Sequence, residues 1–186
     1  MPAKVDQPSS KLSVARQGWF DIRSIVLVAG FGSGTTQLNA FDQSLRSAGI
    51  ADFNLIRVTS IAPAGTPVRR LPTGVREVLG NGLFLPTVYD TLSSNAEGDE
   101  IAAAAGIAIP DEPDVAGVIF VCTCRGPKEA AEEMVRRMVA EGMTGKGHPA
   151  HRCEALAVAD HVTLPWTSVT AGVAFCDAPL EGVFRL

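Results

Sequence analysis

Residues 24–49, SIVLVAGFGSGTTQLNAFDQSLRSAG, decide how the fold begins. The first part, residues 24–30, is an apolar and largely β-branched run that ends in glycine, which predicts a buried strand. Residues 31–36 then predict a glycine-containing loop. Apolar side chains recur after it at three- and four-residue spacing: Leu38, Phe41, Leu45 and Ala48. Gly49 follows where a left-handed residue would end a helix, so the segment predicts a strand, a loop and a helix.

The glycines of this loop allow two interpretations. Gly30-Phe-Gly-Ser-Gly34 after a strand and before a helix is typical of sites where the backbone approaches a nucleotide phosphate. However, Thr35 stands where such a site has a further glycine, and no lysine follows. A tight turn in which Thr35 or Thr36 caps the helix is therefore favoured, with a nucleotide-binding α/β domain as the alternative.

The rest of the chain alternates apolar runs with glycine and proline. The pattern predicts strands at 53–61, 115–122, 154–162 and 168–176, an Ala-rich helix at 97–109, a helix from Pro127 to Glu141 that Gly142 ends, and a turn-rich stretch at 64–85. The strand at 115–122 has apolar residues on both faces, which indicates a central position in its sheet. Strands and helices mix without strict alternation, so the fold class is α/β or α+β with layered sheets.

Length and composition indicate one folded domain. A chain of 186 residues with 46% hydrophobic residues and a mean hydropathy of +0.19 can bury one sizeable core. We assign that domain to residues 21–186 and expect residues 1–20, which are polar and contain Pro2 and Pro8, to form a flexible arm. The net charge of −4 and the lack of a basic stripe argue against nucleic acid as a partner.

The apolar runs also argue against a membrane protein. None approaches the roughly 20 residues that a membrane-spanning helix needs, and residues 1–10 do not resemble a secretory signal. A cytoplasmic location is expected. The four cysteines are then expected as reduced, buried thiols: Cys122, Cys124, Cys153 and Cys176. His148, His151 and His161 lack the spacing of metal ligands, so no metal site is expected.

Residues 54–63, NLIRVTSIAP, carry the most informative chemistry. In one interpretation Thr59 and Ser60 are ordinary hydroxyl residues at the end of a strand, bonded to nearby backbone. In the other, the Ser60 hydroxyl attacks the carbonyl carbon of Thr59 and replaces the peptide bond by an ester. Elimination from that ester, followed by loss of ammonia, would leave a pyruvoyl group at residue 60. Spacing alone does not choose between the two.

A set of collinear motifs favours the second interpretation, in which residue 60 becomes a pyruvoyl group. These are Leu27-Val-Ala-Gly30, Leu38-Asn-Ala-Phe-Asp42, Ala48-Gly-Ile50, Asn54-Leu-Ile-Arg-Val-Thr-Ser-Ile61 with Pro63, Leu85-Pro-Thr-Val-Tyr89, Gly98-Asp-Glu-Ile101, Ile107-Ala-Ile-Pro110 and Gly117-Val-Ile119. In this order and at this spacing the chain resembles the pyruvoyl-dependent arginine decarboxylase family. The resemblance covers roughly residues 25–140 and continues more faintly to about Cys176.

The resemblance implies a four-layer αββα sandwich that assembles as a homotrimer, or a dimer of trimers, with active sites between protomers. It implies self-cleavage between Thr59 and Ser60 into a β chain of residues 1–59 and an α chain of residues 60–186. The α chain would begin with a pyruvoyl group made from Ser60, whose ketone forms a Schiff base with the substrate amine and serves as electron sink. The implied reaction converts arginine, or a related amino acid, into agmatine, or the corresponding amine, and CO2, a step of polyamine biosynthesis.

The resemblance also assigns the residues of the site. Asp42 matches the carboxylate that pairs with the substrate guanidinium. Asn54 matches the amide near the pyruvoyl group, and Leu45 and Ile61 match apolar walls of the pocket. Each has an ordinary alternative, because Asp42 could be a solvated helix residue, Asn54 a turn residue and the two aliphatic residues simple core.

Two positions depart from the family pattern. Thr59 stands where the family usually has serine, and threonine still supplies the backbone carbonyl that cleavage needs. Val121 stands where the family has the glutamate assigned as the acid that protonates the product carbon, and valine cannot donate a proton. Cys122 is adjacent, but on a strand it points to the opposite face. The alternative to an active decarboxylase is therefore a catalytically impaired or unprocessed relative with a role in binding or assembly.

Overall fold

The computed structural model describes residues 22–71, 82–149, 152–163 and 165–177. Five strands form one sheet, here called sheet A, in the order β2-β5-β9-β1-β4. Their bounds are β1 (Ser24–Gly34), β2 (Asn54–Arg57), β4 (Val68–Arg70), β5 (Phe84–Ser94) and β9 (Trp166–Cys176). The arm expected at residues 1–20 lies outside the described residues, as do 72–81 of the stretch expected to be turn-rich.

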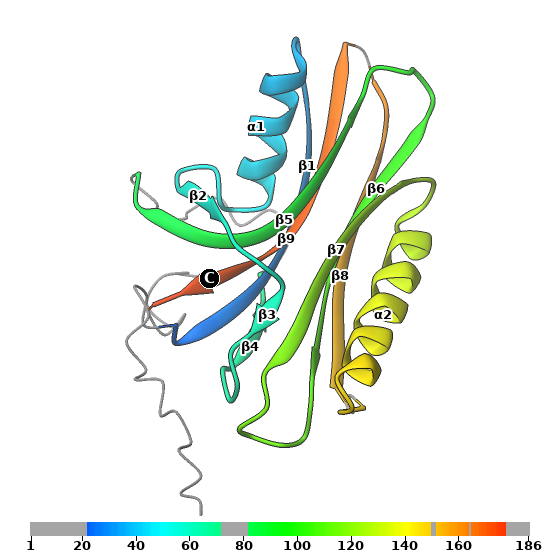
Figure 1. Cartoon of the computed structure of the whole chain (residues 1–186). Coiled ribbons are helices and arrows are strands. Elements are labelled where there is room, and N and C mark those ends of the chain that lie inside the picture. The colour runs from blue at the N-terminus through cyan, green and yellow to red at the C-terminus, as the bar shows by residue number, and fades with distance from the viewer. Residues whose placement is uncertain (1–21, 72–81, 150–151, 164, 178–186) are drawn as a thin grey trace, which may run out of the picture.

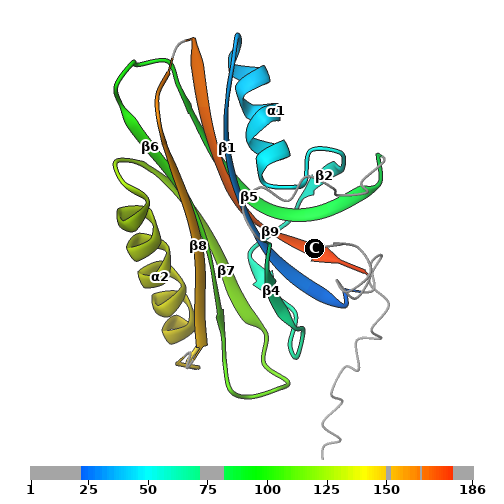
Figure 2. The same cartoon turned by 180° about the vertical axis from the view of Figure 1, so that it is seen from behind.

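Four further strands form sheet B, in the order β3-β7-β6-β8. Their bounds are β3 (Ile61–Ala62), β6 (Glu100–Ile109), β7 (Gly117–Arg125) and β8 (Arg152–His161). The helices are α1 (Gln37–Ser47) and α2 (Lys128–Gly145). Helix α1 covers the outer face of sheet A and α2 the outer face of sheet B, as Figure 1 and the reverse view in Figure 2 show. The expected four-layer αββα sandwich is thereby confirmed.

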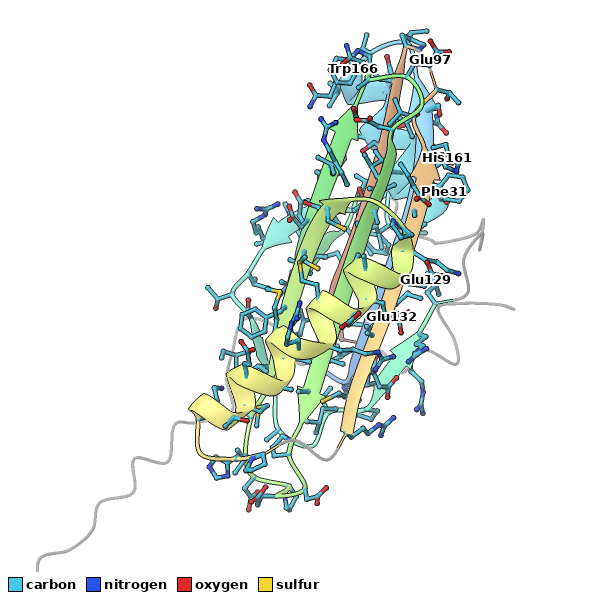
Figure 3. The ribbon with its side chains drawn as sticks, turned by 90° about the vertical axis from the view of Figure 1, so that its right-hand side faces the viewer. Phe31, Glu97, Glu129, Glu132, His161 and Trp166 are labelled. Carbon is cyan, nitrogen blue, oxygen red and sulfur yellow. The ribbon has the colours of Figure 1, made fainter. Side chains whose placement is uncertain are left out.

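The main core lies between the two sheets. It is built from aliphatic residues that alternate along the central strands, among them Ile25 and Leu27 of β1, Ile107 of β6 and Val169 of β9. Smaller clusters lie under the helices, where Ala131, Val135, Val139 and Met143 of α2 face sheet B. Glu129 is exposed near the start of α2, and Glu132 lies at the flank of the helix, where it accepts hydrogen bonds from Arg136 (Figure 3). No helix in the described part of the chain is long and apolar enough to cross a membrane.

Most of the predicted elements are confirmed. The strands expected at 115–122, 154–162 and 168–176 correspond to β7, β8 and β9, and β7 lies inside its sheet between β3 and β6. Helix α1 begins after Thr36, whose hydroxyl accepts the N–H of Asn39 at 3.1 Å, and Gly49 follows its end with φ 78°. Helix α2 follows Pro127 as expected but continues through Gly142 to Gly145, because Gly142 packs closely against Phe120 of β7.

The glycine loop predicted at residues 31–36 is wrong. β1 continues to Gly34, paired with β9 throughout, so the three alternating glycines Gly30, Gly32 and Gly34 lie on one face of an unbroken strand. A Cβ added to Gly30 would lie 2.3 Å from the backbone N of Ala48, and one added to Gly34 would lie 2.5 Å from the N of Ala40. The glycines therefore let α1 approach the backbone of β1, and the phosphate-loop geometry of the nucleotide alternative is absent from this segment.

The Ala-rich helix predicted at 97–109 is also wrong. Residues Glu100–Ile109 form β6, which pairs antiparallel with β7 on one side and β8 on the other. Alanine favours helices, but its small side chain fits a strand that is buried on both faces. Here Ala103 and Ala105 face sheet A, whereas Ala102 and Ala104 face α2. Tertiary packing overrides the intrinsic preference.

The single strand predicted at 53–61 is two strands in different sheets. β2 ends at Arg57 on the edge of sheet A, and the chain then crosses to sheet B, where β3 begins at Ile61. β2 pairs parallel with β5, and β3 pairs antiparallel with β7. The crossover, residues 58–60, therefore joins the two sheets at one edge of the sandwich (Figure 1). It contains Thr59 and Ser60.

Candidate functional site

The crossover is held to both sheets by backbone hydrogen bonds. On the side of sheet A, the N–H of Val58 donates to the carbonyl of Thr87 at 3.2 Å. On the side of sheet B, the N–H of Ile119 donates to the carbonyl of Ser60 at 2.9 Å. Thr59 and Ser60 thus lie between two anchored ends, so their positions follow from the rigid strands β5 and β7.

A tight turn surrounds Ser60. The N–H of Ile61 donates to the carbonyl oxygen of Thr59 at 3.0 Å, which is the two-residue spacing of a γ-turn. The Thr59 carbonyl is therefore polarised by a donor aimed at its oxygen. The Ser60 hydroxyl makes no hydrogen bond to any residue that the structure describes, and the residue is only half-buried. A free hydroxyl next to a polarised carbonyl is the arrangement that the cleavage chemistry needs.

Exposed apolar side chains lie next to Ser60 and along the edge strand that leads to it. Ile61 is 47% exposed, and Phe84 at the start of β5 is 67% exposed. Ile56 on β2 and Leu83 before β5 are exposed as well. Phe84 pairs with Asn54 at the end of β2 away from the crossover, so these exposed apolar side chains are spread along β2 and are not gathered at Ser60.

Asn54 begins β2 and is held by the segment before β5. Its Nδ2 donates to the carbonyl of Gly82 at 2.6 Å, and its backbone N–H donates to the carbonyl of Leu83. Side chains alternate along a strand, so Asn54 lies on the same side of β2 as Ile56 and Val58. Val58 packs against the core between the sheets, so this side of β2 faces sheet B and the opposite side, with Leu55, faces α1.

Asp42 lies on α1, away from the crossover in sequence and in fold. Its carboxylate is 46% exposed and accepts a hydrogen bond from Nε of Arg46, one helical turn later, at 2.9 Å. That hydrogen bond, together with the charge of Asp42, raises the pKa of Arg46. Within one chain no described hydrogen bond or ion pair joins Asp42 to Asn54 or Ser60. Leu45 points the other way and packs under α1 against sheet A.

Val121 lies on the face of β7 that points between the sheets, where it packs against the main core. Cys122 points to the opposite face, towards α2, as its position on the strand predicts. Burial raises the pKa of the Cys122 thiol to about 11, and the charges of Cys124 and Asp90 add to the rise. All four cysteines carry free thiols, but only Cys122 is buried. The expectation of buried thiols is wrong for the other three, Cys124, Cys153 and Cys176, which are partly exposed. In the described part of the chain no three His, Cys, Asp or Glu side chains gather as a metal site would require.

Comparison with known proteins agrees with this geometry. Residues 24–178 match the family model described as pyruvoyl-dependent arginine decarboxylase. A protein of that name from Methanocaldococcus jannaschii is 37% identical over 157 residues, which is 84% of this chain and 88% of that protein. One from Methanococcus maripaludis is 35% identical over 157 residues, 84% of this chain and 89% of that protein. One from Pyrococcus furiosus is 36% identical over 130 residues, 69% of this chain and 79% of that protein.

The chain belongs to the pyruvoyl-dependent arginine decarboxylase family. Members of this family depend on a pyruvoyl group, and the match extends over the crossover, both sheets and both helices. The residues at the crossover fit such a group, because the Ser60 hydroxyl makes no hydrogen bond among the described residues and the Thr59 carbonyl already has a donor on its oxygen.

The structure also contains a residue that the sequence analysis of this family member did not select. Asp90 of β5 lies between Val88 and Leu92 on the strand face that points between the sheets. Because side chains alternate between the two faces of a strand, the sequence of residues 84–94 places this carboxylate on an otherwise largely apolar face. The motif ending at Tyr89 stops one residue before it.

Proposed function

We propose that this protein is a self-cleaving decarboxylase that converts arginine into agmatine and CO2. Its pyruvoyl group would be made from Ser60 after cleavage of the Thr59–Ser60 bond. The observation that carries the proposal is the turn at Ser60, whose hydroxyl has no partner among the described residues and lies next to the hydrogen-bonded Thr59 carbonyl, in a chain of this family.

The turn prepares the first step of cleavage. The Ser60 Oγ attacks the Thr59 carbonyl carbon, and the peptide C–N bond breaks as the new ester C–O bond forms. The N–H of Ile61, which donates to the Thr59 oxygen, stabilises the negative charge that develops there. A single well-placed donor of this kind is worth roughly 10²- to 10³-fold in rate. Elimination then frees the Thr59 carboxyl group, and one water replaces the nitrogen of residue 60, which leaves as ammonia.

The pyruvoyl group supplies a carbonyl for the substrate amine and a sink for the electron pair that CO2 leaves behind. The protein supplies binding and orientation. Asp42 pairs with the guanidinium of arginine, Asn54 orients groups next to residue 60, and Ile61 provides an apolar wall. Leu45, which the family resemblance also assigns to the pocket, is buried under α1 and would act by positioning the helix that carries Asp42.

Asp42 and Ser60 lie on different elements with no described contact, so we propose that a complete site forms between protomers of a homotrimer. The exposed apolar side chains along this edge, Ile56 on β2, Ile61 on β3 and Phe84 at the start of β5, provide surface for such an assembly.

An intact-mass spectrum under denaturing conditions tests the cleavage. The 19.5 kDa chain is expected as two fragments of about 6 and 13 kDa, the larger one blocked at its N-terminus by a carbonyl group. Ser60→Ala should leave one chain, whereas Thr59→Ser, which keeps the carbonyl, should still cleave. A single chain from the wild-type protein would contradict the proposal and favour the unprocessed relative with a role in binding or assembly.

A further inference from the structure

Helix α1 carries Asp42, and most of its contact with sheet A is non-directional. Backbone atoms of the helix lie against the glycines of β1, and Leu45 packs in the apolar cluster between the helix and the sheet. Apolar burial and close approach hold a helix against a sheet, but neither depends on direction as a hydrogen bond does. A hydrogen bond would add a fixed rotation of α1 about its own axis, and with it a fixed place for the Asp42 carboxylate.

Ser44 makes such a bond. It lies two residues after Asp42, within the same helical turn, and is fully buried. Its hydroxyl has two acceptors at 2.7 Å, the carbonyl oxygen of Phe41 and Oγ1 of Thr170 on β9. Within the described residues, no other side chain of α1 forms a hydrogen bond to a strand of sheet A.

Thr170 connects the Ser44 hydroxyl to the sheet. It is fully buried, and its hydroxyl donates to Oγ1 of Thr91, its partner across the β5–β9 pair, at 3.0 Å. The Thr91 hydroxyl in turn donates to the carbonyl oxygen of Val169 at 3.0 Å. The hydroxyls of Ser44, Thr170 and Thr91 therefore form one chain from α1 across β9 to β5, and it ends on the backbone of the sheet.

A small rotation of α1 would move Asp42 by a distance that matters for binding. With its side chains a helix has a radius of about 5 to 6 Å, so a rotation of about 10° moves a terminal carboxylate by about 1 Å. An error of that size in the placement of a binding group can cost up to roughly 10²-fold in activity.

We infer that Thr170 is a positioning residue for substrate recognition: through Ser44 its hydroxyl fixes the rotation of α1 on sheet A, and so the place at which Asp42 meets the guanidinium group. The inference rests on the proposed function, in which Asp42 binds that group. It assigns a role in specificity to a side chain on a strand that is itself buried under the helix.

This role is separate from the self-cleavage chemistry. The crossover is held by two backbone bonds, from the N–H of Val58 to Thr87 and from the N–H of Ile119 to Ser60, and neither involves α1 or β9. Loss of the Thr170 hydroxyl should therefore leave cleavage between Thr59 and Ser60 as it is in wild type. Intact mass under denaturing conditions checks this before any kinetics are measured.

Thr170→Val removes the hydroxyl and keeps the branched shape. Ser44 keeps its acceptor at Phe41 and Thr91 keeps its acceptor at Val169, so neither hydroxyl loses its last acceptor and the fold should be retained. The KM for arginine should rise roughly three- to tenfold, with kcat changed by less than about twofold. The Kd of agmatine, measured by calorimetry, should rise by the same factor. Thr170→Ser keeps the hydroxyl and should restore both values.

Two controls separate positioning from a general loss of stability. Thr167 is an equally buried threonine of β9, but its hydroxyl bonds to the N–H of Thr163 at 2.9 Å and not to α1. Thr167→Val should lower stability and leave the KM for arginine unchanged. The second control repeats Thr170→Val in an Asp42→Asn background, where its effect on KM should shrink to less than about twofold because the group that it positions is gone.

The outcomes distinguish a failed inference from a failed function. If Thr170→Val raises the KM by the same factor with and without the Asp42 carboxylate, or if Thr170→Ser does not restore it, Thr170 does not act through Asp42. An unchanged KM in Thr170→Val also overturns the inference, while the proposed function stands. If cleaved wild-type protein releases no CO2 from arginine, or if Asp42→Asn leaves the KM unchanged, the proposed function or its guanidinium contact fails first, and the inference fails with it.

Discussion

Replacing Gly30 by alanine tests the close contact between α1 and β1. The added Cβ would lie 2.3 Å from the backbone N of Ala48, 2.4 Å from the carbonyl oxygen of Ser44 and 2.7 Å from the carbonyl carbon of Ser47. Comfortable contacts between heavy atoms are about 3.5 to 4 Å, so the end of α1 would have to move outwards by about 1 Å or more. All three atoms belong to the backbone, and no side-chain rotation can relieve the overlap.

We therefore expect Gly30→Ala to lower the free energy of unfolding by about 3 kcal/mol, at the upper end of the usual cost of overpacking. Urea unfolding followed by circular dichroism, at one fixed protein concentration, measures this change. Gly145→Ala is the control, because a Cβ there meets nothing within 4 Å and lies in α2. It should stabilise the protein by up to about 1 kcal/mol. Equal midpoints for Gly30→Ala and wild type would refute the packing role of the glycines.

Three further changes have defined outcomes. Thr36→Ala removes the hydroxyl that caps α1, so urea unfolding should show a loss of about 1 kcal/mol; no loss would mean that the cap is dispensable. The pKa of the Cys122 thiol is raised from 9.0 to about 11, so its contribution to stability is full below pH 9 and disappears as the pH rises to 11. Between pH 9 and 11 the free energy of unfolding should therefore fall less for Cys122→Ala than for wild type. Parallel plots of the free energy of unfolding against pH would contradict this. Asp42→Asn should raise the KM for arginine roughly ten- to a hundredfold while sparing an apolar amino acid of similar length; equal losses would argue against a guanidinium contact.

The parts of the fold that the sequence predicts are those in which local pattern and tertiary packing agree. Helix α1 has its apolar stripe, its Thr36 cap and its Gly49 terminator within one short segment. β6 is the opposite case, because its alanines favour a helix and only the pairing with β7 and β8 makes it a strand. Pairing partners lie far away in sequence, so a local window does not contain that information.

The glycines of β1 likewise could not be interpreted from a local stretch of sequence. Their spacing fits a phosphate-binding loop as well as a strand pressed against a helix, because both need a backbone without side chains. The structure distinguishes the two through the atoms of Ala40 and Ala48 that occupy the space of the missing side chains. Nothing in residues 30–34 alone specifies which backbone approaches them.

Part of the candidate site could be predicted from the sequence and part could not. Thr59 and Ser60 were selected through likeness to a family, and the match of residues 24–178 confirms that family. The hydrogen bond from Ile61 to Thr59 is a property of conformation that composition and spacing do not contain. The contact between Asp90 and Thr123 is likewise invisible in the sequence, because only the packing of β5 against β7 brings the two residues together.

The central claim is that this protein decarboxylates arginine with a group made from Ser60. Release of CO2 from carboxyl-labelled arginine by the purified, cleaved protein measures it most directly, with Ser60→Ala as the blank. The account predicts CO2 and agmatine in equal amounts from wild type and neither from Ser60→Ala. Cleaved wild-type protein that binds arginine and releases no CO2 would contradict it.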